Sequence, residues 1–213
     1  MQFTEVIGRL IELPDVLPAP PVVLMPVRTD AATDWRPTVP LADLATKPAS
    51  VLVLIYPDDD GEARVVLTER VDRGGHHSGE VSFPGGSAES GDVDAAATAL
   101  REATEEIGLD SRQAGVQVIG QLEPFWIPVS GFRVTPILAL AERRPRLEAS
   151  PDEVARIVEA PLGAFLPEGE IEIVEREIRG WSLRYGGYRI DGLHVWGATA
   201  RILGQLGALL QEN

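Results

Sequence analysis

The sequence predicts an α/β/α sandwich, in which a mixed β-sheet is packed between helices. The apolar runs at 51–56 and 64–69 flank the turn-rich segment PDDDGEA and predict an antiparallel hairpin with at least one buried strand. Strands and helices then follow in a mixed rather than a regularly alternating order, which favours a mixed sheet over a parallel doubly wound one. The chain has 213 residues and 44% apolar content, which is enough to bury one sizeable core.

An amphipathic helix is predicted at the start of the chain, because apolar residues recur there at helical spacing before Pro14. These residues are Phe3, Val6, Ile7 and Leu10. The stretch from Pro18 to Pro48 is rich in Pro, Asp, Ala and Thr and predicts an extended surface arm without chemistry. We therefore expect a helix and arm at 1–48, which could serve a homodimer interface, and a main domain at 49–213.

The middle of the chain predicts a strand, a glycine turn and a helix in succession. The extended segment EVSF leads into the turn PGG at 84–86. A helix is then expected to begin near Asp92 to Asp94, where acidic side chains suit the helix dipole, and to end at Gly108. Further strands are predicted at 116–122, 132–140 and 171–178, and at 181–185 and 188–190 around a turn at Gly186-Gly187. A last helix is expected from about His194 to Leu210.

The composition limits the classes of partner. Lys plus Arg number 19 against 33 Asp plus Glu, a net charge of -14, whereas nucleic-acid backbones are bound through clustered Lys and Arg, so no nucleic-acid partner is expected. A chain without cysteine has no disulfide, thiolate zinc site or cysteine nucleophile. No apolar run approaches the roughly 20 residues of a membrane span, and no secretory leader pattern is present, so we expect a cytoplasmic protein without membrane association.

The helix that carries Glu102, Glu105 and Glu106 is predicted to bear the chemistry. Spacings of three and four residues put these carboxylates on one face, and Arg101 can reach Glu105 at the i, i+4 spacing. Two carboxylates about 5 Å apart repel by roughly 3 kcal/mol at an effective dielectric of about 20, so the cluster is costly without cations. Its hard oxygen donors suit Mg²⁺ or Mn²⁺. A solvated charged face is the alternative for these residues alone, but the preceding strand and glycine turn favour a site.

This segment resembles the Nudix box. In that motif a glycine is followed after five residues by Glu, and after seven more by Arg-Glu-apolar-X-Glu-Glu-X-Gly-apolar. Here Gly86 is followed after five residues by Asp92 and after eight more by REATEEIGL at 101–109, so the second half matches at every position. The first half departs by Asp for Glu and by one extra residue.

The resemblance implies a Nudix-type sandwich and metal-dependent hydrolysis of a diphosphate linkage. It implies Glu102 and Glu106 as the principal metal ligands, and Glu105 as a further ligand or a general base. The carbonyl of Gly86 is implied as another metal ligand. Arg101 is a further candidate of the catalytic set, and it is expected to be structural rather than catalytic, through a charge-assisted bond to a box glutamate.

The segment just upstream, VVLTERVDRGGHHSGEVSFPGG, resembles the signature of coenzyme A pyrophosphatases, a branch of the same superfamily. The positions that fit are Leu67, Thr68, Arg70, Gly79, Phe83, Pro84, Gly85 and Gly86. Val71 stands where Ser or Ala is usual, and Gly75 stands where Arg is usual. This resemblance implies cleavage of coenzyme A or acyl-coenzyme A into a phosphopantetheine product and adenosine 3′,5′-bisphosphate.

Two other functions stay open. The departures at Val71 and Gly75 leave room for an enzyme that hydrolyses another nucleoside diphosphate derivative, such as a dinucleotide, ADP-ribose or a nucleotide sugar. The third function is that of a ligand-sensing Nudix domain without turnover. Such domains arise when box carboxylates are lost, whereas all three are present here.

Residues outside the box are expected to assist. Glu153, ahead of an apolar run, is the candidate general base, and the alternative is that it favours a helix start. Arg70 and His77 are candidates for binding a substrate phosphate. Gly85 and Gly86 allow the backbone to approach the substrate closely.

Other candidates carry a structural alternative. Arg73 and His76 are similar to the phosphate-binding candidates but fit the resemblance less well, and His194 is expected to be structural. The aromatic residues flanking a proline-containing turn could stack on an adenine base or a pantetheine arm, or simply pack in the core. They are Phe125, Trp126 and Phe132.

Overall fold

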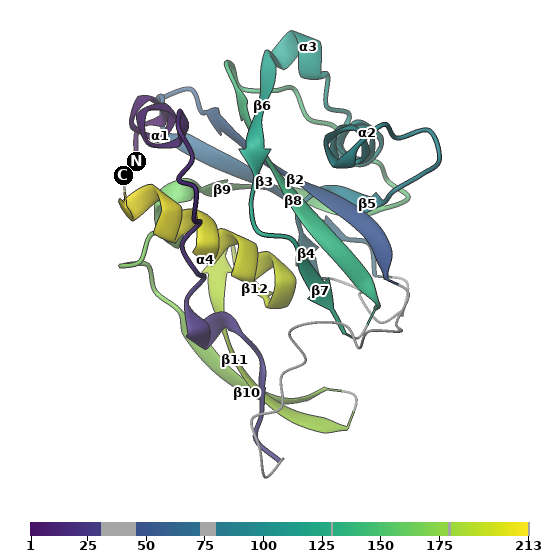
Figure 1. Cartoon of the computed structure of the whole chain (residues 1–213), viewed down its shortest axis with the longest axis vertical. Helices are drawn as coiled ribbons and strands as arrows, with labels where there is room; N and C mark the ends of the chain where they lie inside the picture. Colours follow the sequence, from purple (N-terminus) through teal and green to yellow (C-terminus); the bar gives the residue numbers. More distant parts are fainter. Residues whose placement is uncertain (31–45, 73–79, 129, 179, 213) are drawn as a thin grey trace.

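The computed structural model describes residues 1–30, 46–72, 80–128, 130–178 and 180–212. Within this part of the chain, an eight-stranded mixed sheet lies between α2 (Ala95–Ile107) on one face and α1 (Phe3–Leu10) with α4 (Gly197–Glu212) on the other (Figure 1). A short helix, α3 (Ser111–Ala114), follows α2. The predicted α/β/α sandwich is therefore confirmed.

The main sheet is built around two long parallel strands. β2 (Lys47–Pro57) and β8 (Phe132–Ala141) pair in parallel, and the other pairings described in this sheet are antiparallel. The order is β4-β3-β2-β8-β6, with β5 beside β2, β7 beside β8 and β9 beside β3. The remaining strands are β3 (Ala63–Arg70), β4 (Val81–Ser82), β5 (Gly85–Ser87), β6 (Val116–Gln121), β7 (Phe125–Ile127) and β9 (Val154–Pro161). β2 and β3 form the predicted hairpin.

Two apolar cores lie on opposite faces of the main sheet, because successive side chains of a strand point to opposite faces. The core on the face covered by α2 includes Leu52, Leu54, Tyr56, Ala99, Ala103 and Ile107. The core on the face covered by α1 and α4 includes Val53, Ile55, Phe3, Val6, Leu203 and Leu206. We refer to these as the α2 face and the α4 face. Even-numbered residues of β2 thus lie on the α2 face and odd-numbered ones on the α4 face.

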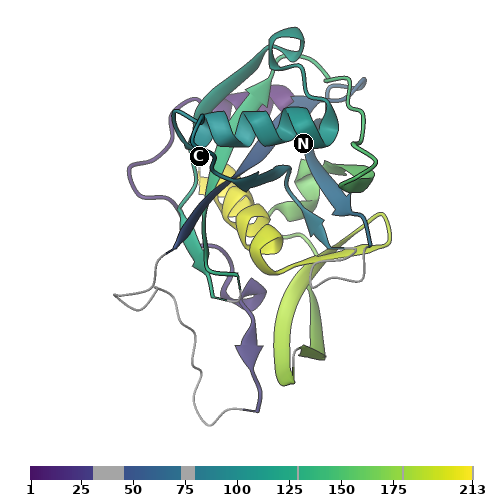
Figure 2. The same ribbon diagram turned by 90° about the vertical axis from the view of Figure 1, so that its right-hand side faces the viewer.

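A smaller antiparallel sheet extends away from the sandwich (Figure 2). Its order is β1-β11-β10, and β12 also pairs with β11. These strands are β1 (Val27–Arg28), β10 (Glu172–Ile178), β11 (Trp181–Ile190) and β12 (Leu193–Trp196). Two 3₁₀ helices complete the elements, with η1 (Val22–Leu24) before β1 and η2 (Leu162–Phe165) after β9.

Gly186 and Gly187 lie inside β11, so the predicted turn at this position is wrong. A Cβ atom on Gly187 would lie 2.5 Å from His194 Nε2, so these glycines allow close packing within the strand. The chain reverses instead at Asp191 and Gly192, which have positive φ values of 50° and 80°. The two glycines therefore mark a close approach between neighbouring strands rather than a turn of the chain.

The final helix begins later than predicted. His194 belongs to β12, where it pairs with Arg189 of β11, and α4 starts at Gly197. Pairing with the neighbouring strand therefore overrides the helical pattern at these residues. The predicted apolar side of the helix is buried, including Ile202 and Leu210.

The predicted N-terminal helix is confirmed as α1. Phe3, Val6 and Leu10 are buried in the same apolar cluster as Leu24 and the inward face of α4, so the start of the chain packs on the sandwich. The division of the chain at residue 48 and a homodimer interface in this region stay predictions. Among the described helices, none is long and apolar enough to cross a membrane.

We predict that Leu10→Ala lowers the free energy of unfolding by about 2–5 kcal/mol, because it leaves a cavity between α1 and the sheet. The Leu10 side chain is 1% exposed, whereas that of its neighbour Ile11 is 76% exposed. Ile11→Ala is therefore the matched control and should change the free energy by less than about 0.5 kcal/mol. Urea denaturation followed by circular dichroism measures both. Equal, small effects would contradict a core role for α1.

Candidate active site

The predicted acidic cluster lies on a helix whose ends and buried face are fixed. The Asp94 side chain caps the N-terminus of α2 by accepting a hydrogen bond of 2.7 Å from the Ala97 backbone N–H. Gly108 ends the helix in the left-handed region, with φ of 63°. Ala103 and Ile107 are fully buried against the sheet. The helix therefore presents its carboxylates from a rigid position.

The three glutamates of α2 differ in exposure. Glu106 is 2% exposed, whereas the side chains of Glu102 and Glu105 are 15% and 55% exposed. The backbone N–H of Gly85 donates a hydrogen bond of 3.2 Å to Glu106 Oε2. Glu102 and Glu106 therefore face inward toward β5, and Glu105 faces outward.

The two glycines of β5 lie against β2 and α2 with no room for a Cβ atom. A Cβ atom on Gly86 would lie 2.4 Å from Glu102 Oε1, and one on Gly85 would lie 2.3 Å from the Ser50 carbonyl oxygen. The two glycines pair with Ser50 and Val51 of β2. The glycine turn thus lets the carboxylates of the helix lie directly against backbone. Contact of this backbone with a metal or a substrate stays a prediction.

Arg101 joins the acidic side chains of this region. Its guanidinium donates to both carboxylate oxygens of Asp92 at 3.2 Å, and to Glu102 Oε1 and Glu105 Oε2 at 3.0 Å each. It also donates to the Ser87 carbonyl at 3.0 Å. The predicted contact between Arg101 and Glu105 is confirmed. The bond to Asp92 was missed, although Asp92 occupies the acidic position of the motif and so carried a signal.

The carboxylates fall into two electrostatic classes. Hydrogen bonds from Arg101 hold the pKa of Asp92 at about 2. Burial raises the pKa of Glu106 to about 7, because the charged form loses water. Burial also raises the pKa of Glu102, against the opposing hydrogen bond from Arg101, and the charge of Glu105 adds to the rise. The protein therefore leaves the charge on the inward glutamates only partly compensated.

Two charged side chains outside α2 act on the same glutamates. The charge of Glu153 raises the pKa of both Glu102 and Glu106, and the charge of Arg70 lowers that of Glu106. Both side chains thus lie within electrostatic reach of the cluster. Arg70 ends β3 and Glu153 immediately precedes β9, the strand that pairs with β3. The pairing of β3 with β9 therefore brings Arg70 and Glu153 near α2.

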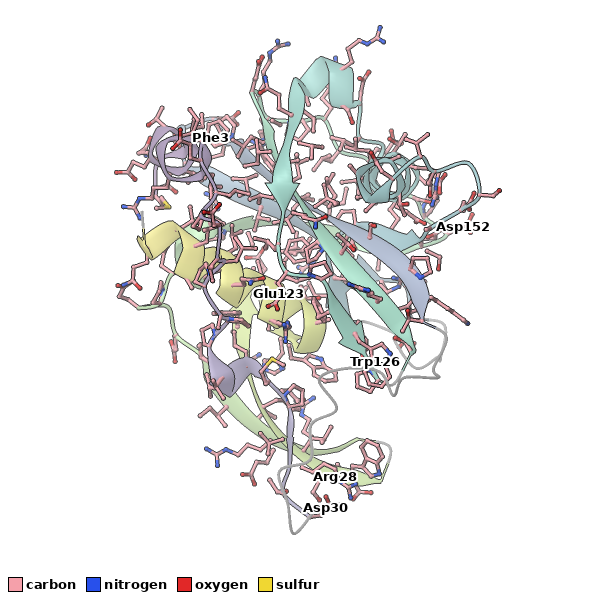
Figure 3. All side chains as sticks on the ribbon, in the orientation of Figure 1. Phe3, Arg28, Asp30, Glu123, Trp126 and Asp152 are labelled. Carbon is pink, nitrogen blue, oxygen red and sulfur yellow. The ribbon has the colours of Figure 1, made fainter. Side chains whose placement is uncertain are left out.

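The alternative that Glu153 favours a helix start is wrong, because β9 begins at the next residue. The segment before β9 is anchored to the last turn of α2, where the Ser150 N–H donates to the Glu106 carbonyl at 2.8 Å. The Val71 N–H donates to the Glu153 carbonyl at 3.1 Å and fixes the other side. Figure 3 shows the neighbouring Asp152 at the side of the molecule on which α2 lies. Pairing of β9 with β3 therefore makes the segment that follows Glu153 extended rather than helical.

The donor set suits a hard divalent cation. All candidate ligands are carboxylate or carbonyl oxygens, which Mg²⁺ and Mn²⁺ prefer. The raised pKa of Glu106 marks a buried charge that a cation would stabilise. Within the described ranges, no three acidic or imidazole side chains already converge as a metal-binding group. Because Glu102 and Glu105 are turned toward Arg101, coordination requires rotation of these side chains on a fixed helix.

The described structure does not test four of the remaining candidates. His77, His76, Arg73 and Gly75 lie outside the described residues. His194 lies in β12 with its ring centroid 5.9 Å from that of Tyr185. Its expected structural role stays a prediction.

Comparison with known proteins identifies related sequences over most of the chain. The family profile of the NUDIX domain matches residues 46–183. Nudix hydrolase 15, mitochondrial, of Arabidopsis thaliana is 39% identical over 173 residues, which are 78% of this chain and 60% of that protein. The uncharacterized Nudix hydrolase NudL of Citrobacter koseri is 36% identical over 171 residues, 80% of this chain and 86% of that protein. The chain thus spans less than two thirds of the plant relative's length.

Solved structures support the same fold. A MutT protein from Methanosarcina mazei superposes with a TM-score of 0.51 at 16% identity, over 81% of this chain and 99% of that one. A MutT/nudix family protein from Enterococcus faecalis gives a TM-score of 0.50 at 17% identity, over 81% and 69% of the two chains. The family profile and the identity to the bacterial relative show that the chain belongs to the Nudix family.

Proposed function

We propose that the protein is a metal-dependent hydrolase that cleaves a diphosphate linkage in a nucleoside diphosphate derivative. The observation that carries this proposal is the position of Glu102 and Glu106 against the backbone of Gly85 and Gly86. Oxygen donors are held there by a rigid helix, and one of them is buried. Nudix hydrolases generally use divalent metal ions, and Mg²⁺ or Mn²⁺ suits these donors.

Each residue of the cluster has a distinct proposed role. Glu102 and Glu106 hold the metal, with Glu105 and the Gly86 carbonyl as further ligands. The bound ion offsets charge on the diphosphate and makes a water molecule more acidic. Arg101 orients the glutamates that it contacts. The helix thus supplies both the ligands and the side chain that positions them.

The proton and the substrate are handled by residues outside the helix. Glu153 is the proposed general base, since its carboxylate is exposed and acts electrostatically on both inward glutamates. Arg70 is proposed to bind a substrate phosphate beside Glu106, and His77, which lies outside the described residues, is proposed to do the same. A guanidinium at this position balances part of the negative charge that the substrate brings.

We propose coenzyme A or acyl-coenzyme A as the substrate, with a phosphopantetheine product and adenosine 3′,5′-bisphosphate as products. The support is the upstream signature. Leu67, Thr68 and Phe83 of that signature are buried and stabilise the strands around the site. Arg70 is the signature residue that acts on the acidic cluster. The departures at Val71 and Gly75 make another nucleoside diphosphate derivative the alternative substrate.

A substrate panel tests this proposal. Purified protein is incubated with Mg²⁺ or Mn²⁺ at neutral and alkaline pH with coenzyme A, acyl-coenzyme A, NADH, ADP-ribose or diadenosine polyphosphates, and products are separated by chromatography. We expect preferential release of adenosine 3′,5′-bisphosphate from coenzyme A. Cleavage of another compound while coenzyme A stays intact would leave only the broader proposal. Binding without hydrolysis of any compound would favour the ligand-sensing function.

We predict that Glu106→Gln abolishes turnover and also removes a pH dependence of stability. In the metal-free wild type, burial raises the pKa of Glu106 from 4.5 to about 7, so the folded protein holds a proton that the unfolded chain releases in this window. Stability therefore falls as pH rises through this window, by about 3 kcal/mol from this group. Glutamine has no such titration, so the variant should lack this loss.

Denaturation of the wild type and of Glu106→Gln at pH 5 and pH 8, each with a chelator, measures how the free energy of unfolding depends on pH in the two proteins. Glu142→Gln, which replaces an exposed glutamate at the far end of β8, is the matched control and should behave like the wild type. Added Mg²⁺ should stabilise the wild type at pH 8 but not the Glu106 variant. An unchanged pH dependence in the Glu106 variant would contradict the assigned titration.

We predict that Glu153→Gln lowers turnover by more than about tenfold without changing the metal concentration needed for half-maximal activity, because a base rather than a ligand is lost. Initial rates across metal concentrations separate the loss of a base from the loss of a ligand. Near-normal turnover would exclude Glu153 as the base, and a shifted metal dependence would make it a ligand.

A further inference from the structure

The register of the main sheet decides which aromatic candidate faces the acidic cluster. Ser50 of β2 pairs with Gly86 on one side and with Thr135 of β8 on the other. These residues lie on the α2 face, where Gly86 abuts the glutamates. Arg133 shares that face because it lies two residues before Thr135. β7 pairs Trp126 directly with Arg133, so both side chains lie on the α2 face.

The other two aromatic candidates lie on the α4 face and are covered. The Arg201 guanidinium lies over the Phe125 ring, 4.6 Å from its centroid, and the Lys47 ammonium lies 6.0 Å from the Phe132 centroid. Phe125 also packs against the core of that face. No aromatic ring or cation from the described ranges stacks on Trp126. Trp126 is half-buried, and it is the one of the three candidates that lies on the α2 face without a described ring or cation over it.

Arg133 is an exposed cation beside this ring. Across the described part of the chain, no hydrogen bond or ion pair engages its side chain, although the chain carries a net charge of -14. By contrast, Arg101, Arg144 and Arg189 are each paired with carboxylates. A guanidinium left free in such a chain is suited to bind an anion from outside the protein.

The spacing of the sheet sets the reach of these side chains. Neighbouring strands lie about 4.8 Å apart and residues rise about 3.3 Å along a strand, so the Cα atom of Arg133 lies about 12 Å from that of Gly86. Trp126, one strand further, lies about 16 Å from Gly86 by the same spacing. Figure 3 shows Trp126 at the end of the sheet where β8 begins. A nucleotide whose diphosphate lies at the glutamates can extend along this face toward both residues.

We propose that Trp126 and Arg133 form a subsite for the nucleoside part of the substrate. The indole stacks on the base, and the guanidinium binds a phosphate monoester on the ribose. This subsite rests on the proposed function and deepens it, because it selects diphosphates that carry an additional ribose phosphate. The glutamates and their metal hold the diphosphate itself and cannot make that distinction.

Steady-state kinetics with coenzyme A and 3′-dephospho-coenzyme A test the subsite. We expect the wild type to prefer coenzyme A in kcat/KM, and Arg133→Gln to lower kcat/KM for coenzyme A by about tenfold or more while leaving the dephospho compound nearly unchanged. Arg133→Lys should restore part of the preference. Trp126→Leu should lower kcat/KM for both compounds. Arg143→Gln and Trp181→Leu replace exposed residues elsewhere and should leave both values unchanged.

Direct binding separates failure of the subsite from failure of the proposed function. Calorimetry compares adenosine 3′,5′-bisphosphate with adenosine 5′-monophosphate, and the wild type should bind the bisphosphate more tightly through Arg133. An equal preference in wild type and Arg133→Gln, in either assay, would overturn the subsite while leaving hydrolysis intact. Absence of hydrolysis by the wild type, with the binding preference present and lost in the variant, would overturn the enzyme proposal alone.

Discussion

The Arg101 guanidinium is the constraint on which the rest of the site depends. It brings together acidic side chains from the loop before α2 and from the helix itself, namely Glu89, Asp92, Glu102 and Glu105. Carboxylates this close repel one another by a few kcal/mol per pair unless a cation lies between them. The same side chain binds the Ser87 carbonyl at the end of β5, so one residue holds the strand, the loop and the helix together.

Arg101 also divides the carboxylates into two kinds. The guanidinium compensates the charge of Asp92 and holds its pKa at about 2, whereas burial raises the pKa of Glu106 to about 7. The charge of Asp92 is compensated within the protein, whereas that of Glu106 is offset only in part by Arg70, so a bound cation would stabilise it. On a chain with a net charge of -14, an anionic substrate needs that cation too. The free-energy cost of burying the Glu106 carboxylate is thus linked to the binding of a cation.

Elements with strong local signals could be predicted from the sequence. The end of α2 followed from Gly108, whose backbone freedom ends the helix wherever it packs, and its start was expected near the acidic residues Asp92 to Asp94. The acidic triplet followed from its spacing and its motif. The glycines at 186 and 187 were misassigned because glycine marks both turns and close approaches, and only the packing of His194 against Gly187 distinguishes them. The start of β9 was missed because pairing with β3 is not local.

The face of the main sheet on which a residue lies could not be predicted from the local sequence pattern, for a related reason. Trp126 and Arg133 come near the acidic cluster only through the pairing of β5, β2, β8 and β7, which joins four separate segments of the chain. A shift of one residue in the parallel pairing of β2 with β8 would move every side chain of β8 to the opposite face. The buried alternation of β8, with Ile137 and Ala139 under α2, opposes any such shift. The same apolar packing that stabilises the sandwich therefore fixes which side chains can meet a substrate.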